Sequence, residues 1–317
     1  MYFYCQINVT EKRIIMIWTK ELDDFKQYLK LERGLSNNSI EAYIIDLTKL
    51  IKYIESVDSS LTVNQVTTEH IRGLMEQLIK ANMSTRSQAR ILSGIKAFFR
   101  FLLLEEVIEK DPSNVLATPK IARRYPVILT VEEIERIIAS VDMSKLEGYR
   151  NRAIIETLYS CGLRVSEVTE LKMSNMFFES GYIKVEGKGS KERLVPIGAK
   201  AVSDINHYIE HYRRTMVNAK GNEDILFLNR SGKKLSRITI FSIIKAAVKN
   251  AGIDKVVSPH TFRHSFATHL IQGGANVRAV QEMLGHESIL TTEVYTHIDN
   301  EHLRKTVEDC HPYKEDK

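Results

Sequence analysis

The first third of the chain has the hydrophobic spacing of α-helices. Apolar residues recur every three or four positions in four successive stretches. These stretches are residues 22–29, 40–54, 71–79 and 85–109. The last one stops before Asp111-Pro112, because proline disfavours the helical conformation of the residue before it. We therefore expect an all-helical domain over residues 16–112.

Two segments lack this period. Residues 1–15 show no clear pattern, and Met16 stands just before a helix start, so we expect an extension or a mis-assigned start there. Residues 111–126 hold three of the six prolines of the chain. They predict an extended linker, assigned to 113–126, in which Arg123 and Arg124 are candidates for phosphate contact.

The remaining sequence mixes helical and strand patterns. A capping-box pattern at Thr130 to Glu133 opens a helix. Residues 182–185 and 193–197 read as two strands joined by a Gly-Lys-Gly-Ser turn at Gly187. Further helices are expected at about 199–219, 236–251, 259–272, 276–284 and 288–298. The fold class is therefore mainly α with a small β-hairpin, with a mixed α+β domain over 127–300.

The predicted helix over 85–109 has two distinct faces. At ~100° per residue, its apolar residues group on one side. Arg86, Arg90 and Arg100 fall within about 80° of one another on the opposite side, with no acidic residue among them. A solvated charged face and a helix laid against a phosphate backbone both fit this stripe.

Composition narrows the class of protein. Hydrophobic residues make up 43% and charged residues 27%, as in ordinary globular proteins, and the net charge of +5 permits a polyanionic partner without requiring one. Three distant cysteines, Cys5, Cys161 and Cys310, predict no disulfide framework and suggest a cytoplasmic protein. No apolar run approaches the ~20 residues of a membrane span.

Several catalytic motifs are missing. The sequence has no phosphate-binding GxxxxGK[ST] loop, no GxGxxG after a strand, no HExxH and no cluster of acidic residues. Nucleotide hydrolysis and metal-dependent cleavage are therefore poorly supported, and we expect neither a metal nor a cofactor.

A dense block of polar residues runs from Pro259 to His297. His260 and Arg263 are three positions apart and share a helix face, and Pro259 suits the first turn of that helix. His260 and His264 have the spacing of two metal ligands, but no carboxylate or cysteine ligand stands near them. Taken alone, Tyr295 reads as a residue that packs in a core.

Five signatures together resemble the tyrosine site-specific recombinases, closest to the bacterial XerC/XerD type. They stand in the order expected of that family. They are Cys161-Gly-Leu-Arg-Val-Ser-Glu167, the hairpin Gly187 to Pro196, His260-x-x-Arg263, Leu284-Gly-His286 and Tyr295-Thr-His297. The resemblance covers about residues 17–313.

The resemblance implies a fold and a reaction. The expected fold is a helical, SAM-like core-binding domain followed by a mixed α+β catalytic domain. Tyr295 would attack the scissile phosphate and form a 3′-phosphotyrosyl link, while Arg164 and Arg263 bind its non-bridging oxygens. Lys188 would act as general acid and His260 as general base.

The remaining implied roles concern binding and assembly. His286 would hydrogen-bond the phosphate or position the tyrosine. Glu167 would either orient Arg164 or serve as a surface cap. The implied partners are duplex DNA, a second copy or a paralogous recombinase in a tetramer on two sites, and an FtsK-like translocase. Residues 301–317 would be the segment that protomers exchange.

Other functions remain open at this point. Resolution of chromosome dimers at a dif-like site is the expected role. An integrase of a mobile element would use the same chemistry. A type IB topoisomerase uses a similar residue set without choosing a sequence, and a non-catalytic DNA-binding relative would need none of these residues.

Overall fold

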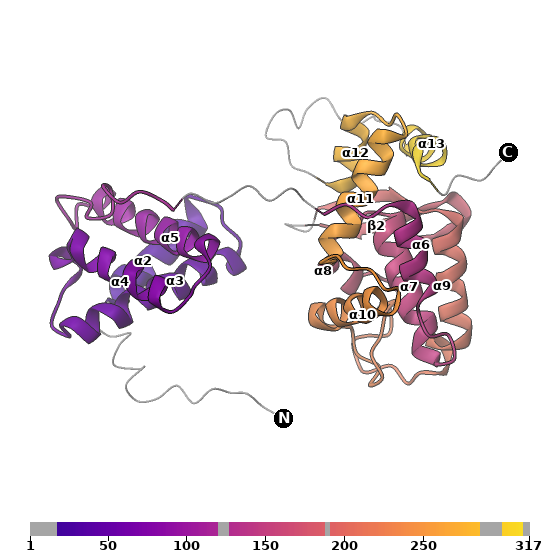
Figure 1. The fold of residues 1–317 in the computed structure, drawn as a ribbon, viewed down its shortest axis with the longest axis horizontal. Coiled ribbons are helices and arrows are strands. Elements are labelled where there is room, and N and C mark those ends of the chain that lie inside the picture. Colours follow the sequence, from indigo (N-terminus) through magenta and orange to yellow (C-terminus); the bar gives the residue numbers. More distant parts are fainter. Residues whose placement is uncertain (1–17, 120–126, 188–190, 286–299, 313–317) are drawn as a thin grey trace. The chain divides into compact units, whose positions relative to one another are not determined.

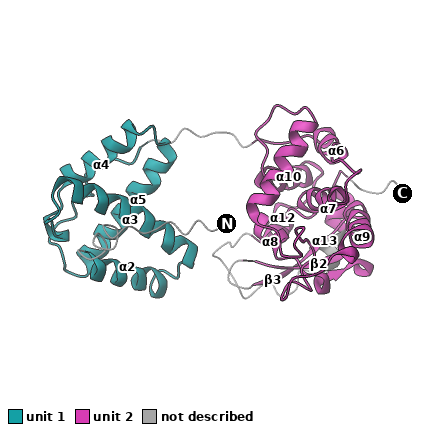
Figure 2. Cartoon of the chain, turned by 90° about the horizontal axis from the view of Figure 1, so that it is seen from below, with its two compact units in different colours: residues 1–124 teal, residues 125–317 magenta. Residues whose placement is uncertain are grey.

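The computed structural model describes residues 18–119, 127–187, 191–285 and 300–312, with side chains of the last segment from 305 onward. The chain divides into two compact units, Met1–Arg124 and Tyr125–Lys317 (Figure 2). Each unit has its own hydrophobic core. The linker expected at 113–126 stays a prediction, because residues 120–126 lie outside the described part.

The first unit is helical, as predicted (Figure 1). Its elements are α2 (Thr19–Leu31), α3 (Asn37–Val57), the 3-10 turn η1 (Val63–Gln65), α4 (Thr68–Lys80) and α5 (Thr85–Leu104). Phe25 of α2 and Phe98 of α5 meet edge-to-face with ring centroids 5.3 Å apart, and both are fully buried. The helix predicted to reach Glu109 ends at Leu104, and Glu106 then adopts a left-handed φ of 55°.

The second unit combines helices with one small sheet. Its first elements are α6 (Val131–Ala139), α7 (Leu146–Ser160), α8 (Val165–Thr169), η2 (Met173–Asn175), β1 (Met176–Phe177), η3 (Phe178–Ser180), β2 (Tyr182–Glu186) and β3 (Glu192–Pro196). They are followed by α9 (Ala199–His211), η5 (Arg213–Thr215), α10 (Arg237–Asn250), α11 (Pro259–Gln272), α12 (Val277–Leu284) and α13 (Asn300–Cys310).

The sheet is antiparallel with strand order β1-β2-β3. The predicted hairpin is β2–β3, and β1 adds a two-residue edge strand that is too short to give a pattern. The helix predicted over 199–219 ends at His211 and continues as η5. The helix predicted at 288–298 lies outside the described residues. None of the helices in the described part is long and apolar enough to cross a bilayer.

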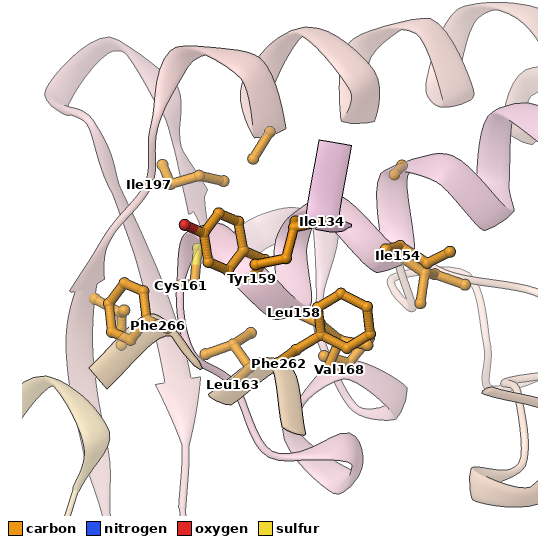
Figure 3. Packing of buried hydrophobic residues seen from close by; sticks show 14 of the residues in the cluster. Ile134, Ile154, Leu158, Tyr159, Cys161, Leu163, Val168, Ile197, Phe262 and Phe266 are labelled. Atoms are coloured by element: carbon orange, nitrogen blue, oxygen red, sulfur yellow. The ribbon is translucent and has the colours of Figure 1, made fainter. Parts of the chain in front are cut away.

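Helix α7 lies at the centre of the second core and carries the chain to the site. Its residues Leu158 and Tyr159 pack against α11 residues such as Phe262 and Phe266 (Figure 3). Gly162 follows α7 with a φ of +57°, and a Cβ there would lie 2.4 Å from a ring carbon of Phe266. Only glycine fits this turn, because it tolerates both the left-handed backbone and the close contact.

Helix α13 packs on α11, β3 and α12 of its own unit. His311, just after it, is buried against the rings of Tyr159 and Phe266, with centroids 4.9 and 5.7 Å away. Burial, together with the charges of His269 and Lys200, lowers the pKa of His311 to about 3. The exchange of residues 301–317 between protomers stays a prediction.

Candidate active site

Arg164 stands at the N-cap of α8, directly after the turn at Gly162. Its guanidinium donates through Nη1 to Glu167 Oε1 at 2.9 Å and through Nη2 to the carbonyl oxygen of Gly285 at 2.9 Å. About a third of the side chain, 35%, is exposed. The contacts therefore fix the guanidinium while part of it still faces solvent.

Arg263 approaches the same place from the second turn of α11. Its residue exposure is 8%, and Nη1 donates to the carbonyl oxygen of Gly162 at 2.8 Å while Nη2 donates to that of Leu284. Burial lowers the pKa of Arg263 to about 10, and the nearby positive charge of Arg164 adds to this effect. The group therefore remains a cation at neutral pH.

Glu167 is the carboxylate that these cations share. It lies in the first turn of α8, is 4% exposed, and also accepts a hydrogen bond from the backbone N–H of Arg164 at 2.7 Å. Arg263 Nη1 lies 3.9 Å from its Oε2. Burial alone would raise the pKa of Glu167, but the hydrogen bonds and charge of Arg193 and the hydrogen bonds of Arg164 hold it below its usual value. Glu167 both orients Arg164 and caps α8.

Arg193 of β3 is a member of this cluster that we did not predict. It donates to both oxygens of Glu167, Nη1 to Oε1 at 2.8 Å and Nη2 to Oε2 at 3.1 Å. The sequence did contain a signal for it. Arg193 alternates with Val195 and so belongs to the buried face of the strand, where a charge needs a partner.

The last carbonyls of α12 face the cluster. Arg193 Nε donates to Met283 O at 2.8 Å, while Arg263 and Arg164 bind the oxygens of Leu284 and Gly285. These are carbonyls that a helix end leaves without intrahelical partners, and the negative end of the helix dipole favours cations there. Three cations around one carboxylate leave the described cluster positively charged, and such a cluster can bind an anion.

The histidines of α11 divide by burial. His260 is exposed at the start of the helix, and its side chain forms no hydrogen bond with the described residues. His269 is buried, and its Nδ1 lies 2.9 Å from the hydroxyl of Tyr159, so it packs in the core. Burial lowers its pKa. Within the described segments, no three His, Cys, Asp or Glu side chains are grouped as metal ligands.

Several predicted residues lie outside the described segments. Lys188 falls in 188–190, and His286 and Tyr295 fall in 286–299. The linker residues Arg123 and Arg124 fall in 120–126. Arg164, His260 and Arg263 are thus the described members of the predicted catalytic set, and their roles in catalysis stay predictions.

The arginine stripe of α5 is exposed, but its members differ. Arg90 reaches α3, where Nη1 lies 2.7 Å from Asp46 Oδ2 and Nη2 donates to Oδ1 at 2.9 Å. Arg86 and Arg100 pair with no acid among the described residues. The partner of Arg90 was hidden from the sequence pattern because it comes from another helix.

Comparison with known proteins identifies the class. The profile of the phage integrase family matches residues 128–302, and that of the phage integrase N-terminal SAM-like domain matches residues 22–106. The chain belongs to the phage integrase family, and it is a tyrosine recombinase of the Xer type, an enzyme that exchanges DNA strands.

Curated relatives agree over nearly the whole length. The chain is 40% identical to the tyrosine recombinase XerD of Oceanobacillus iheyensis over 92% of its own length and 98% of the relative's. It is 39% identical to XerD of Staphylococcus epidermidis over the same shares. The XerH site-specific recombinase, in a post-cleavage complex with a palindromic difH substrate, has the same fold, with a TM-score of 0.66, 23% identity, and coverage of 90% of this chain and 84% of that one.

Proposed function

We propose that this enzyme cleaves and rejoins duplex DNA through Tyr295. The tyrosine oxygen would attack the scissile phosphorus, form a 3′-phosphotyrosyl bond and break the bond to the 5′ oxygen. His260 accepts the phenol proton, and Lys188 donates a proton to the leaving 5′ oxygen. One phosphodiester replaces another, so the reverse reaction needs no nucleotide.

The arginines stabilise the charge that develops during this step. Arg164 and Arg263 bind the non-bridging oxygens of the phosphate, and His286 adds a hydrogen bond to the phosphate or to the tyrosine. Arginine suits this role because its planar fork keeps its charge and can bond two oxygens at once. A fixed cation stabilises the pentavalent transition state without reorganising.

The main support for this proposal is the convergence of Arg164 and Arg263 on Glu167 from separate helices. Arg164 Nη1 lies 2.9 Å from Glu167 Oε1, and Arg263 Nη1 lies 3.9 Å from Glu167 Oε2. The buried Arg263 is already fixed by the Gly162 and Leu284 carbonyls, and Arg164 is partly open to solvent. A prearranged pair of cations with excess positive charge is what a scissile phosphate requires.

We further assign the enzyme to chromosome-dimer resolution in the cytoplasm, at a dif-like site. The similarity to XerD over almost the entire chain supports this role. DNA is the substrate, and the working form is a tetramer with itself or a paralogous recombinase on two sites. Residues 301–317 would then pass to the neighbouring protomer, and an FtsK-like translocase would activate the complex.

A suicide substrate tests the chemistry. The full-length protein is incubated with a nicked duplex carrying the host's dif-like site, and the covalent adduct is resolved on a denaturing gel. We expect an adduct with the wild type and none with Tyr295→Phe at equal DNA binding. An adduct formed by Tyr295→Phe would show that another residue is the nucleophile.

Arginine variants test the phosphate contacts. Arg164→Ala and Arg263→Ala should each slow cleavage by roughly 10²–10³-fold while retaining DNA binding. Arg214→Ala, an exposed arginine of the same unit, is the matched control and should cleave at the wild-type rate. Relaxation of a plasmid lacking any dif-like site would instead indicate a type IB topoisomerase.

A further inference from the structure

Arg193 points inward from the sheet. Its cross-strand partner Val185 and the next residue on its face, Val195, are buried at 1% and 0% exposure. Residues two apart on a strand share a face, so Arg193 must lie on the same buried side. Its side chain is 15% exposed. A charge in this position needs a specific partner.

All three nitrogens of the Arg193 guanidinium already donate hydrogen bonds. Two go to Glu167, forming a bidentate pair with both oxygens, and the third goes from Nε to Met283 O. Gly285 packs on the same side chain, because a Cβ there would lie 3.3 Å from its Cδ, Nε and Cζ atoms. Arg193 thus joins β3 to α8 and to the end of α12.

Removal of Arg193 would leave Glu167 short of partners. A carboxylate that is 4% exposed cannot turn to water, and it would attract the nearest remaining cations. Among the described residues those are Arg164, already bonded to it, and Arg263, whose Nη1 lies 3.9 Å away. Either movement would draw a guanidinium away from its present carbonyl contacts.

We propose that Arg193 is a positioning residue for strand cleavage: it bonds both oxygens of Glu167 alongside Arg164, and so keeps this carboxylate from pulling Arg164 and Arg263 off the carbonyl contacts that hold them for the scissile phosphate. This inference rests on the proposed function, since it assigns those two arginines to the phosphate. Arg193 itself does not contact the substrate. It acts through Glu167 and through the end of α12.

The test compares two substrates that differ in charge. One suicide duplex carries the normal scissile phosphodiester, and the other carries a neutral methylphosphonate at the same position. Arg193→Met should cleave the phosphodiester about 10–100-fold more slowly than the wild type at unchanged DNA affinity. Losses of this size are typical when a residue is removed that orients the side chains in direct contact with the bound group. On the methylphosphonate the difference should shrink to about 3-fold or less, because there is no anionic oxygen for the arginines to neutralise.

Two controls separate this inference from the proposed function. Arg164→Ala should lose cleavage on the phosphodiester and regain it, relative to wild type, on the methylphosphonate; an equal loss on both would refute the phosphate role of Arg164 itself. Lys184→Met on β2 removes an exposed pair with Glu192, 3.1 Å away, and should match the wild type on both substrates.

The results that overturn the role of Arg193 are specific. They are wild-type cleavage of the phosphodiester by Arg193→Met, or an equal loss on both substrates, which would indicate general damage to the sheet. The double variant Arg193→Met/Glu167→Gln has no unpaired buried charge, so it provides the same test if Arg193→Met alone is unstable. It should cleave the phosphodiester at the rate of Glu167→Gln alone, and a further loss would contradict the proposal.

Discussion

Glu167 holds Arg164 at both ends of the residue. One carboxylate oxygen accepts from the guanidinium at 2.9 Å, and the other accepts from the backbone N–H at 2.7 Å. The first turn of α8 therefore fixes both the backbone of Arg164 and the orientation of its guanidinium. A buried carboxylate in this position is part of the geometry of the site and not only a counter-charge.

Substitution of Glu167 should affect stability and cleavage together. Glu167→Ala leaves Arg193 without its bidentate partner, so we expect the free energy of unfolding to fall by about 3–5 kcal/mol. Glu167→Gln keeps one acceptor oxygen, so it should lose less stability and less cleavage activity than Glu167→Ala. Thermal unfolding and single-turnover cleavage measure the two effects. Equal melting temperatures for the alanine variant and the wild type would contradict this account of the cluster.

Local signals in the sequence were enough to predict much of the fold. Helix α11 has the predicted bounds, 259–272, because Pro259 suits its first turn and its apolar period is complete. The hairpin was also predicted, since strand-forming residues flank a glycine turn. The helix predicted over 85–109 was too long, because the periodicity persists beyond the left-handed turn at Glu106.

The site could be predicted only in part. The motif resemblance selected Arg164 and Arg263, but it gave no information on the carbonyls that hold them. Those contacts join residues far apart in the chain, which no local pattern encodes. Strand alternation could have singled out Arg193, but it could not identify its partner Glu167, which lies on another element. The pairing of Arg90 with Asp46 is a third contact of this kind, between α5 and α3.

A methyl group at Gly285 should displace the side chain of Arg193 while leaving that residue itself unsubstituted. Gly285 has a φ of +62°, and its Cβ would lie 3.3 Å from the guanidinium, so that side chain must shift. Gly252→Ala is the matched control, with a φ of +65° and nothing within 4 Å. Both should lose about 1–2 kcal/mol of stability from the left-handed backbone. Only Gly285→Ala should also slow single-turnover cleavage, and equal cleavage by the two variants would argue against the packing on Arg193.

Two measurements test the three arginines of α5. If each contacts a phosphate, Arg86→Ala, Arg90→Ala and Arg100→Ala should each reduce the slope of log affinity against log salt by about 1. Arg90→Ala should also lower the melting temperature, because Asp46, at 2% exposure, loses a bidentate partner and keeps Lys49 as its one ion-pair partner among the described residues. Arg72→Ala on α4, which removes an exposed pair, is the control for both measurements.

The outcome for α5 decides between the two readings of its stripe. Unchanged salt slopes for Arg86→Ala and Arg100→Ala would show that the stripe is a solvated charged face, which its sequence pattern also allows. A lower melting temperature for Arg90→Ala with an unchanged slope would assign that residue to the α3–α5 contact alone.

Glu156 gives the second unit a stability that depends on pH. Its residue exposure is 2%, and Oε1 has no hydrogen-bond partner within the described part of the chain. Burial raises the pKa of Glu156 from 4.5 to about 7, and the negative charge of Asp204 acts in the same direction. The folded protein therefore keeps a proton on this group between pH 4.5 and 7 that the unfolded chain has released.

The sign of the effect follows from that proton. The stabilising contribution is complete below pH 4.5, decreases as the pH rises, and is lost above about 7, where the folded protein holds a buried carboxylate.

Glu156→Gln removes the charge, so it should raise the free energy of unfolding by roughly 1–3 kcal/mol at pH 8 and change it little at pH 4.5. Thermal unfolding at both pH values should show an increase of about 2–12 °C at pH 8 only. Glu135→Gln, on the exposed side of the same region, should have little effect at either pH. An equal increase at both pH values would mean that packing, and not the charge of Glu156, is responsible.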